Sequence, residues 1–191
     1  MRVRKELRRS TSPKKNWDSA EYMGFNPDSH DWARLAAFID GEGSINLSPK
    51  KIKSGTPLYY GKVVVTNTDF RLAKWCLDTF GINFYSHSNN ALPASRNQNW
   101  ALCVYAQACS NKAAWILRNC LPYFILKRQQ AEIVLEHQRT KHPDYFERGS
   151  GIKTPANVLD FQLSLKKRLA ELNKRGRKSS ETELTSKVME A

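Results

Sequence analysis

The sequence predicts an α+β fold in which helices cover one face of an antiparallel sheet and leave the other face open. Apolar residues at helical spacing alternate along the chain with short runs that are β-branched or alternate polar with apolar. Gly, Pro and Asn separate these runs, and the order that results is helix, hairpin, helix, hairpin, helices. Two hairpins in this order are typical of one antiparallel sheet with helices on one side.

The first helix is predicted from its start signals and its stop signals. Asp28 and Asp31 are acidic capping residues placed before the apolar run 32–39. Gly41 and Gly43 follow that run and are predicted to end the helix.

The remaining elements follow from the same patterns. The predicted strands are 44–48, 62–66, 82–88 and 99–105, and the predicted helices are 72–80, 113–121, 127–139 and 156–173. Gly81 stops the second helix, and Pro122 breaks the third. The predicted organisation is a basic tail over 1–25, a core domain over 26–140 and a helical C-terminal extension with a basic segment over 141–191.

The charge points to a polyanionic partner. The chain carries 31 Lys and Arg against 18 Asp and Glu, a net charge of +13, with seven basic residues and one acid in each of the segments 1–15 and 166–178. Nucleic acid is the leading candidate for the partner. These basic segments are either solvated tails or they bind phosphates of the nucleic acid next to the sequence that the domain recognises. In the second case they would add affinity without adding sequence specificity.

Neither a membrane nor a disulfide framework is indicated. The chain has no run of about 18 apolar residues and no secretory signal, so we expect an intracellular protein that is not secreted. Its four cysteines form no C-x-x-C pair, which argues against a zinc site.

A stripe of small residues marks the first helix. Ala33, Ala37 and Gly41 recur every four residues, so another backbone could pack very close to them. The stripe fits either a second copy of the helix or this chain's own sheet. Asp40 and Glu42, which bracket Gly41 at the end of an apolar helix, favour the pair of copies. Pairing would bring two copies of Glu42 together, and close carboxylates with a polyanionic substrate call for a divalent cation such as Mg²⁺.

The segment Leu35-Ala-Ala-Phe-Ile-Asp-Gly-Glu-Gly43 resembles the signature of the LAGLIDADG homing endonucleases. Ala37 stands where that family usually has Gly, Phe38 replaces an aliphatic residue and Glu42 replaces Asp. The order of elements also resembles the family's αββαββα core. Segment 66–69 is similar to the family's junction between strand and helix, and segment 122–131 is similar to the segment that supplies an active-site lysine, which here falls on Lys127. Segment 172–182 is similar to the family's single-motif members encoded in introns.

The resemblance implies a site and a reaction. It implies Glu42 and the Gly41 carbonyl as metal ligands, Asn67 as the residue that positions attacking water, Lys127 as a stabiliser of phosphate charge and Arg71 as a nearby basic residue. Asp40 points about 100° away from its neighbour in a helix, so we expect it to hydrogen-bond backbone where helices cross. The predicted dimer interface comprises Ala33, Ala37, Asp40 and Gly41.

Alternation along the strands predicts which residues face DNA. Ile45 and Leu47 are expected to point into the core, which leaves their neighbours on the open face. The predicted DNA-binding residues are Ser44, Asn46, Ser48, Lys50, Tyr60, Lys62, Ser86, Ser88 and Asn99. Any of these polar side chains could instead be simply solvated.

The resemblance thus implies a site-specific homing endonuclease that hydrolyses both strands of a long pseudopalindromic double-stranded DNA. Because the chain carries one copy of the motif, we expect a homodimer that uses Mg²⁺ and no small-molecule cofactor. The alternatives are an RNA maturase or a DNA-binding regulator with the same fold and no cleavage activity, and an unrelated basic RNA-binding protein.

Overall fold

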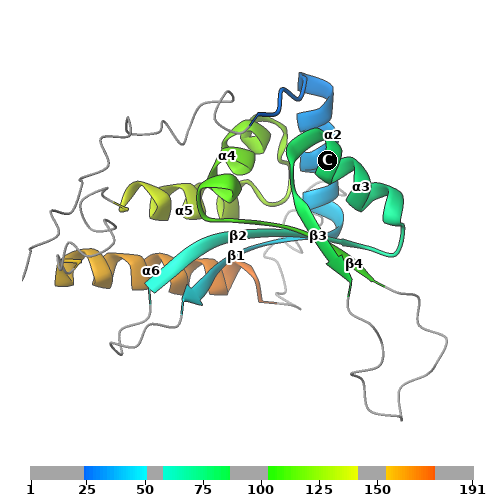
Figure 1. The fold of residues 1–191 in the computed structure, drawn as a ribbon. Helices are drawn as coiled ribbons and strands as arrows, with labels where there is room; N and C mark the ends of the chain where they lie inside the picture. The colour runs from blue at the N-terminus through cyan, green and yellow to red at the C-terminus, as the bar shows by residue number, and fades with distance from the viewer. Residues whose placement is uncertain (1–23, 51–57, 87–102, 142–153, 175–191) are drawn as a thin grey trace, which may run out of the picture.

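The computed structural model describes residues 24–50, 58–86, 103–141 and 154–174, which form the predicted α+β fold. Figure 1 shows helices above one face of a four-stranded sheet. The elements in chain order are α2 (Ser29–Glu42), β1 (Gly43–Lys50), β2 (Leu58–Asn67), α3 (Phe70–Phe80), β3 (Asn83–Ser86), β4 (Val104–Cys109), α4 (Ser110–Cys120), the 3-10 helix η2 (Leu121–Tyr123), α5 (Arg128–Arg139) and α6 (Ala156–Leu172).

The ends of α2 and α3 follow the capping signals in the sequence. Asp28 accepts the backbone N–H of Asp31 at 2.8 Å, and the Asp31 carboxylate accepts that of Asp28, which completes a capping box. Of the two glycines predicted to end the helix, Gly43 does so and begins β1, whereas Gly41 lies within the last turn of α2. Gly81 ends α3 in the left-handed conformation with φ at +62°, which glycine adopts without strain.

The sheet is antiparallel, with strand order β1-β2-β4-β3. Each hairpin contributes an outer strand and an inner strand, and the inner strands pair with each other through Val64 and Gln107. Residues directly opposite across antiparallel strands share a face. Ile45, Val63 and Ala108 therefore point together toward the helices, and all three are buried.

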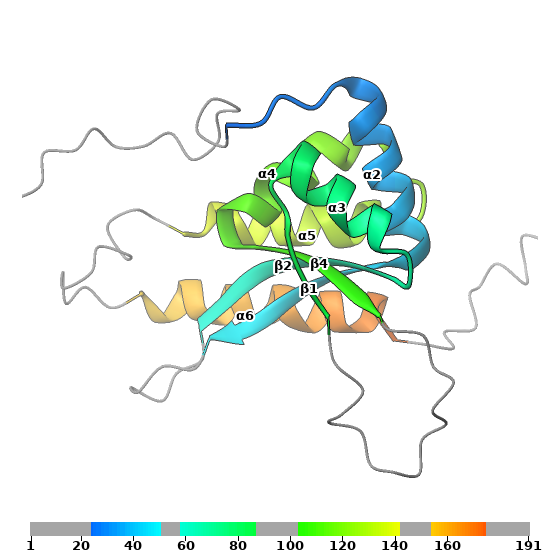
Figure 2. The same ribbon diagram turned by 45° about the vertical axis from the view of Figure 1, so that its right-hand side comes forward.

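The core lies between the sheet and the helices α2, α4 and α5. Trp32 of α2 packs against Phe80 of α3 and Trp115 of α4, with ring centroids 5.0 and 4.9 Å apart. Leu35 and Ile39 are completely buried on the same side of α2. Figure 2 shows α2 running from the top of the molecule down to the sheet, where the chain continues into β1.

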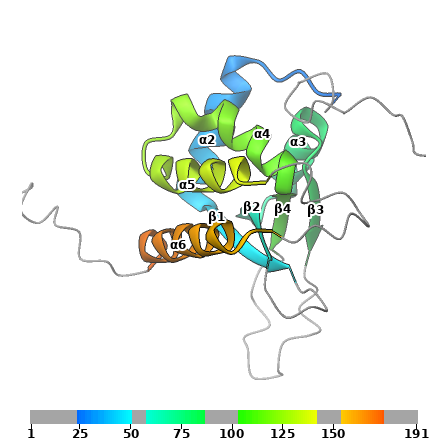
Figure 3. The same ribbon diagram turned by 90° about the vertical axis from the view of Figure 1, so that its left-hand side faces the viewer.

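The helix α6 flanks the outer edge of the sheet instead of covering its open face. Figure 3 shows α6 beneath α5 and beside β1, and its Leu165 and Leu169 are buried there. At the C-terminal end of α6, the Asn173 side chain donates to the Ile45 carbonyl at 2.9 Å and to Asn46 Oδ1 at 3.1 Å. The edge strand β1 therefore has a side-chain partner for its backbone.

Two sequence predictions about the second hairpin are wrong. The described part of the fourth strand runs over Val104–Cys109 and so continues beyond the predicted end at 105, because burial of Ala106 and Ala108 outweighs the weak strand propensity of alanine. Residues 99–102 lie outside the described residues. The open-face assignment of Ser86 is also wrong: Ser86 pairs with the buried Val104 and shares the helix side with Phe84. Ser88 and Asn99 lie outside the described residues.

None of the helices in the described part of the chain has the length and apolar character to cross a membrane.

Candidate functional site

The carboxylate of Glu42 lies where α2 meets the sheet. Glu42 is the last residue of α2 and is exposed, while the next residue already belongs to β1. Asn67, the last residue of β2, donates from Nδ2 to Glu42 Oε2 at 2.6 Å. The end of the first helix and the end of the second strand therefore meet at one hydrogen-bonded pair.

The orientation of the Asn67 amide is fixed from its other side. Its Oδ1 accepts the backbone N–H of Asp69 at 2.7 Å, an interaction within the turn between β2 and α3. Because the oxygen is held by that N–H, the NH₂ group is directed at Glu42. Asn67 thus acts as a local turn residue and as a partner of the carboxylate.

Asp40 has its partners within its own chain. The carboxylate is buried and accepts three backbone N–H groups, those of Ile125 at 2.7 Å, Leu126 at 3.1 Å and Lys127 at 2.9 Å. These N–H groups precede α5, so the carboxylate joins the last turn of α2 to the start of α5. This arrangement leaves Asp40 occupied and directed away from the exposed end of α2.

Lys127 binds the same helix end in return. Its ammonium donates to the carbonyl of Ile39 at 2.9 Å and to the carbonyl of Asp40. Partial burial lowers the pKa of Lys127, and the nearby Asp40 opposes that shift. A cation among the last carbonyls of a helix is favourable because the helix dipole is negative there. Lys127 therefore stabilises the turn of α2 that carries Glu42.

Arg71 is engaged with Asp69 at the start of α3. Its guanidinium contacts Asp69 Oδ2 at 2.6 Å, and its side chain is 90% exposed. The bonds from Arg71 hold the pKa of Asp69 at about 2, well below the usual carboxyl value. The Arg71 guanidinium therefore stays charged and exposed to solvent at the edge of the site.

A single chain offers few metal ligands at this position. Among the described residues there is no group of three or more His, Cys, Asp or Glu side chains that could hold a metal ion. Glu42 is one carboxylate, and Gly41 has open space around the position that a Cβ would occupy. Mg²⁺ in proteins is commonly held by one or two carboxylates with water and phosphate oxygens. The donor set fits a cation that is shared with a substrate and a second carboxylate.

The small-residue stripe is exposed. The buried positions of α2 are Trp32, Leu35, Ala36, Ile39 and Asp40. By contrast, Ala37 and Gly41 are exposed and Ala33 is half-buried. Of the two interpretations of the stripe, packing against this chain's own sheet does not occur.

The open face of the sheet carries six of the predicted DNA-binding residues. Register and alternation place on it Ser44, Asn46, Ser48, Lys50, Tyr60 and Lys62. Asn46 also accepts the hydrogen bond from Asn173 at the edge.

The sequence predictions missed an aromatic pair on this face. Tyr85 of β3 stacks on Tyr105 of β4 with ring centroids 5.4 Å apart, and the Tyr85 hydroxyl donates to Gln107 at 2.8 Å. The alternation in Asn83-Phe84-Tyr85-Ser86 contains the signal, because assigning Phe84 to the core puts Tyr85 on the open face.

Comparisons with known proteins give matches in structure and none in sequence. No family model matches the chain, and neither does any curated protein. The homing endonuclease I-CvuI in complex with its target matches with a TM-score of 0.55 and 19% identity over 78% of this chain and 85% of that one. The archaeal intron-encoded homing endonuclease I-Vdi141I with DNA matches with 0.56 and 16% identity, over 82% and 93%.

A third structure differs in length. The LAGLIDADG homing endonuclease I-SmaMI bound to cleaved DNA matches with a TM-score of 0.55 and 14% identity over 75% of this chain, but over only 45% of the I-SmaMI chain. Identities this low establish a fold and leave the reaction open. The fold predicted from the sequence is confirmed, and the chain has the fold of the LAGLIDADG homing endonucleases.

Proposed function

We propose that this protein is a homodimeric endonuclease that uses a divalent cation to hydrolyse both strands of a pseudopalindromic double-stranded DNA. The observation that carries the proposal is the pair formed by Glu42 and Asn67, whose side-chain atoms lie 2.6 Å apart where α2 ends and the sheet begins. The bond occupies Glu42 Oε2 and holds the carboxylate in place, and its exposure leaves it accessible to a cation from solvent.

The open sheet face supports DNA as the substrate. A two-stranded ribbon fits the major groove, and here β1 and β2 present polar and basic side chains on one side. The net charge of +13 favours a polyanion. I-CvuI, I-Vdi141I and I-SmaMI, which share this fold, were each solved with DNA.

Magnesium is the proposed cation. Glu42 would hold it, with the Gly41 carbonyl as a second ligand, and the bound cation would activate water and stabilise the leaving 3′ oxygen. I-CvuI complexes were solved in the presence of calcium and of magnesium, and these ions agree with the choice of a divalent cation for this chain.

The remaining polar residues are assigned by what they touch. Asn67 would keep Glu42 Oε2 oriented and so place the water that the carboxylate and cation bind. Lys127 would hold the end of α2 and add positive charge close to the scissile phosphate. Arg71, which is exposed beside Asp69, would contact the DNA backbone near the site.

Two features favour a homodimer. The stripe of Ala33, Ala37 and Gly41 permits close approach of a second α2. Each chain also supplies one candidate metal-binding carboxylate, that of Glu42, whereas cleavage of two DNA strands would use two. The I-SmaMI chain, of which this chain spans 45%, has room for a second unit of equal size. A symmetric pair of single units would supply the same arrangement.

The test is Glu42→Gln, with Glu171→Gln as the matched control on the exposed surface of α6. The substrate is a duplex in which the two genomic sequences that flank this reading frame or its intron are joined directly. We expect Glu42→Gln to abolish cleavage in Mg²⁺ and to keep DNA binding, while the control cuts normally.

Two outcomes would contradict the proposal. Full-rate cleavage by Glu42→Gln would exclude Glu42 as the ligand. A wild-type protein that binds the duplex and leaves it intact at every Mg²⁺ concentration would instead support a regulator or a maturase.

A further inference from the structure

Two neighbouring residues expose more apolar side chain than any other large hydrophobic residue in the described part of the chain. Ile125 is 87% exposed and Leu126 is 70% exposed, in the segment between η2 and α5. Adjacent exposed aliphatic residues of this size are typical of an interaction surface. Neither side chain takes part in the DNA-facing sheet.

The backbone of this segment is held in place by α2. The Asp40 carboxylate accepts the N–H groups of both residues, at 2.7 and 3.1 Å, and so the two apolar side chains project from a fixed support. A preorganised segment loses little conformational entropy when it binds. The segment is therefore suited to insertion into a complementary groove.

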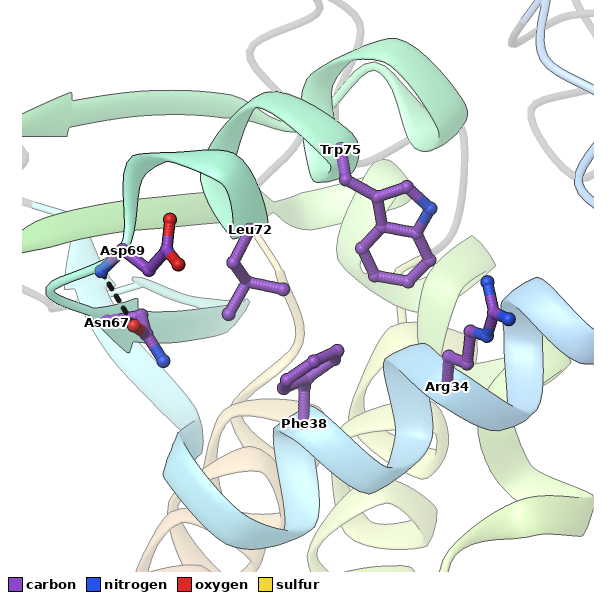
Figure 4. A pocket seen from close by; sticks show the side chains of 6 residues that line it. All are labelled: Arg34, Phe38, Asn67, Asp69, Leu72 and Trp75. Atoms are coloured by element: carbon purple, nitrogen blue, oxygen red, sulfur yellow. Dashed lines mark hydrogen bonds between the residues drawn. The ribbon is translucent and has the colours of Figure 1, made fainter.

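A groove of about 470 Å³ lies between α2 and α3, and its walls are mainly apolar. Phe38 from α2 and Leu72 and Trp75 from α3 point toward one another across it, with Arg34, Asn67 and Asp69 at its margins (Figure 4). Phe38 itself remains 38% exposed. The groove would accept aliphatic side chains.

The segment and the groove lie on opposite flanks of the same helix. Asp40, which holds the segment, and Phe38, which lines the groove, are two residues apart in α2 and so project about 160° apart. The exposed stripe of Ala37 and Gly41 lies between them. The segment of one chain therefore cannot fill the groove of that chain.

A twofold axis along α2 would bring the two features together. Both copies must present their open sheet faces to one DNA duplex, and the sheet begins where α2 ends, at Gly43. An axis parallel to α2 satisfies that condition, and it sets each flank of one helix against the opposite flank of the other. The groove of each copy then faces Ile125 and Leu126 of its mate.

We infer that Ile125 and Leu126 of each protomer fill the groove between α2 and α3 of a second copy. This inference rests on the proposed homodimer and deepens it by naming the contacts that select the partner. The interface then has three parts: a central contact between the small residues of the two α2 helices and, on each side, an apolar contact. In each apolar contact Ile125 and Leu126, which we call the plug, occupy the groove of the other protomer. These two apolar contacts would set the register of one α2 against the other and would strengthen the association of the two protomers.

The test exchanges charge between plug and groove. Leu126→Glu places a carboxylate in the groove of the mate, and Leu72→Lys places an ammonium inside the groove. Each variant alone should weaken the homodimer on the order of a hundredfold in sedimentation equilibrium. An equimolar mixture should form a heterodimer, because one of its two contacts pairs Glu with Lys and the other is the unaltered contact.

The control is Leu163→Glu, which alters another exposed leucine on α6. It should dimerise like the wild type. Circular dichroism and thermal unfolding of each monomeric variant check that the fold is retained, and the rescue by mixing succeeds only if both variants are folded.

Other results separate the possible failures. A wild-type chain that is monomeric while it cuts DNA would contradict the homodimer itself. A wild-type dimer together with a Leu126→Glu variant that dimerises equally well would contradict the inference alone. A third result is a monomeric Leu72→Lys variant that has lost thermal stability and forms no heterodimer with Leu126→Glu. It would indicate that another segment of the same chain, such as 1–23 or 175–191, occupies the groove, and it would also overturn the inference.

Discussion

The carboxylate of Asp40 accepts the backbone N–H of Lys127 at 2.9 Å, and the ammonium of Lys127 donates in return to the backbone carbonyl of Asp40. The two residues are far apart in sequence and belong to different helices. Their reciprocal bonds join the end of α2 to the start of α5. The site depends on this junction, because Glu42 lies only two residues after Asp40 in α2.

Asp40→Ala should destabilise the fold. The substitution leaves three backbone N–H groups without their acceptor in a partly buried position, and we expect a loss of about 3 kcal/mol or more in the free energy of unfolding. Urea denaturation measures the loss, with the exposed Asp78→Ala on α3 as the control. Equal midpoints for the two variants would contradict the role of the carboxylate.

Lys127→Met separates the two tasks of the lysine. Loss of the bonds to the carbonyls of Ile39 and Asp40 should lower the free energy of unfolding by about 2 kcal/mol. It should also lower the cleavage rate at temperatures where the variant is fully folded. Lys127→Arg should recover part of both. A variant with unchanged stability and greatly reduced cleavage would make Lys127 a purely catalytic residue.

Asn67→Leu should impair the metal-binding carboxylate without unfolding the protein. The substitution removes the bond to Glu42 Oε2, and the loss of such a supporting bond typically costs about 10 to 100-fold in metal affinity or activity. The measurement is the Mg²⁺ dependence of DNA cleavage. Asn67→Gln keeps the amide and should retain part of the activity. A normal Mg²⁺ profile for the leucine variant would show that Glu42 is oriented by other groups.

Gly41→Ala and Gly43→Ala form a matched pair with opposite expected effects. A Cβ on Gly41 meets nothing within 4 Å, so alanine should stabilise the monomer by roughly 0.5 to 1 kcal/mol through helix propensity and yet weaken the dimer. A Cβ on Gly43 would lie 2.6 Å from the Ile39 backbone and should destabilise each chain. Thermal unfolding and sedimentation distinguish the two. A stronger dimer for Gly41→Ala would argue against close packing of the helices.

His137 should make the protein sensitive to acid. Burial, with a smaller effect of the Lys141 charge, lowers its pKa from 6.5 to about 4, and both ring nitrogens are buried without a hydrogen-bond partner. Between these values the unfolded chain binds a proton that the folded chain does not. The free energy of unfolding should therefore fall by as much as about 3 kcal/mol as the pH drops from about 7 to about 4.

His137→Leu should remove most of that dependence, as measured by urea denaturation at several pH values. The exposed His30→Gln is its control and should leave the dependence unchanged. If the leucine variant lost stability on acidification as steeply as the wild type, carboxylates elsewhere would be responsible.

The sequence was sufficient for elements whose signals are local. Asp28 and Gly81 carry their capping chemistry in the residue type, and the helices α2 and α3 begin and end, respectively, at these residues as expected. The end of the fourth strand lies beyond the predicted position because Ala106 and Ala108 form a strand through burial against helices, and this tertiary effect has no local signature.

The candidate site shows the same division. The motif and its resemblance singled out Glu42, Asn67 and Lys127, but the partners of those residues are set by the fold. The bond between Asn67 and Glu42 spans 25 positions, and the bond from Lys127 to Ile39 spans 88. No residue pattern predicts contacts at such separations, and the plug formed by Ile125 and Leu126 became visible only once their exposure was known.

The bond from Asn173 to the Ile45 carbonyl has a consequence for the behaviour of the free protein. An uncovered outer strand invites a strand from another molecule, and aggregation often begins in this way. Within the described residues, the opposite edge strand, β3, spans four residues, whereas β1 spans eight. Asn173 and α6 therefore shield the longer of the two described edges, and we expect their removal to promote aggregation of the free protein.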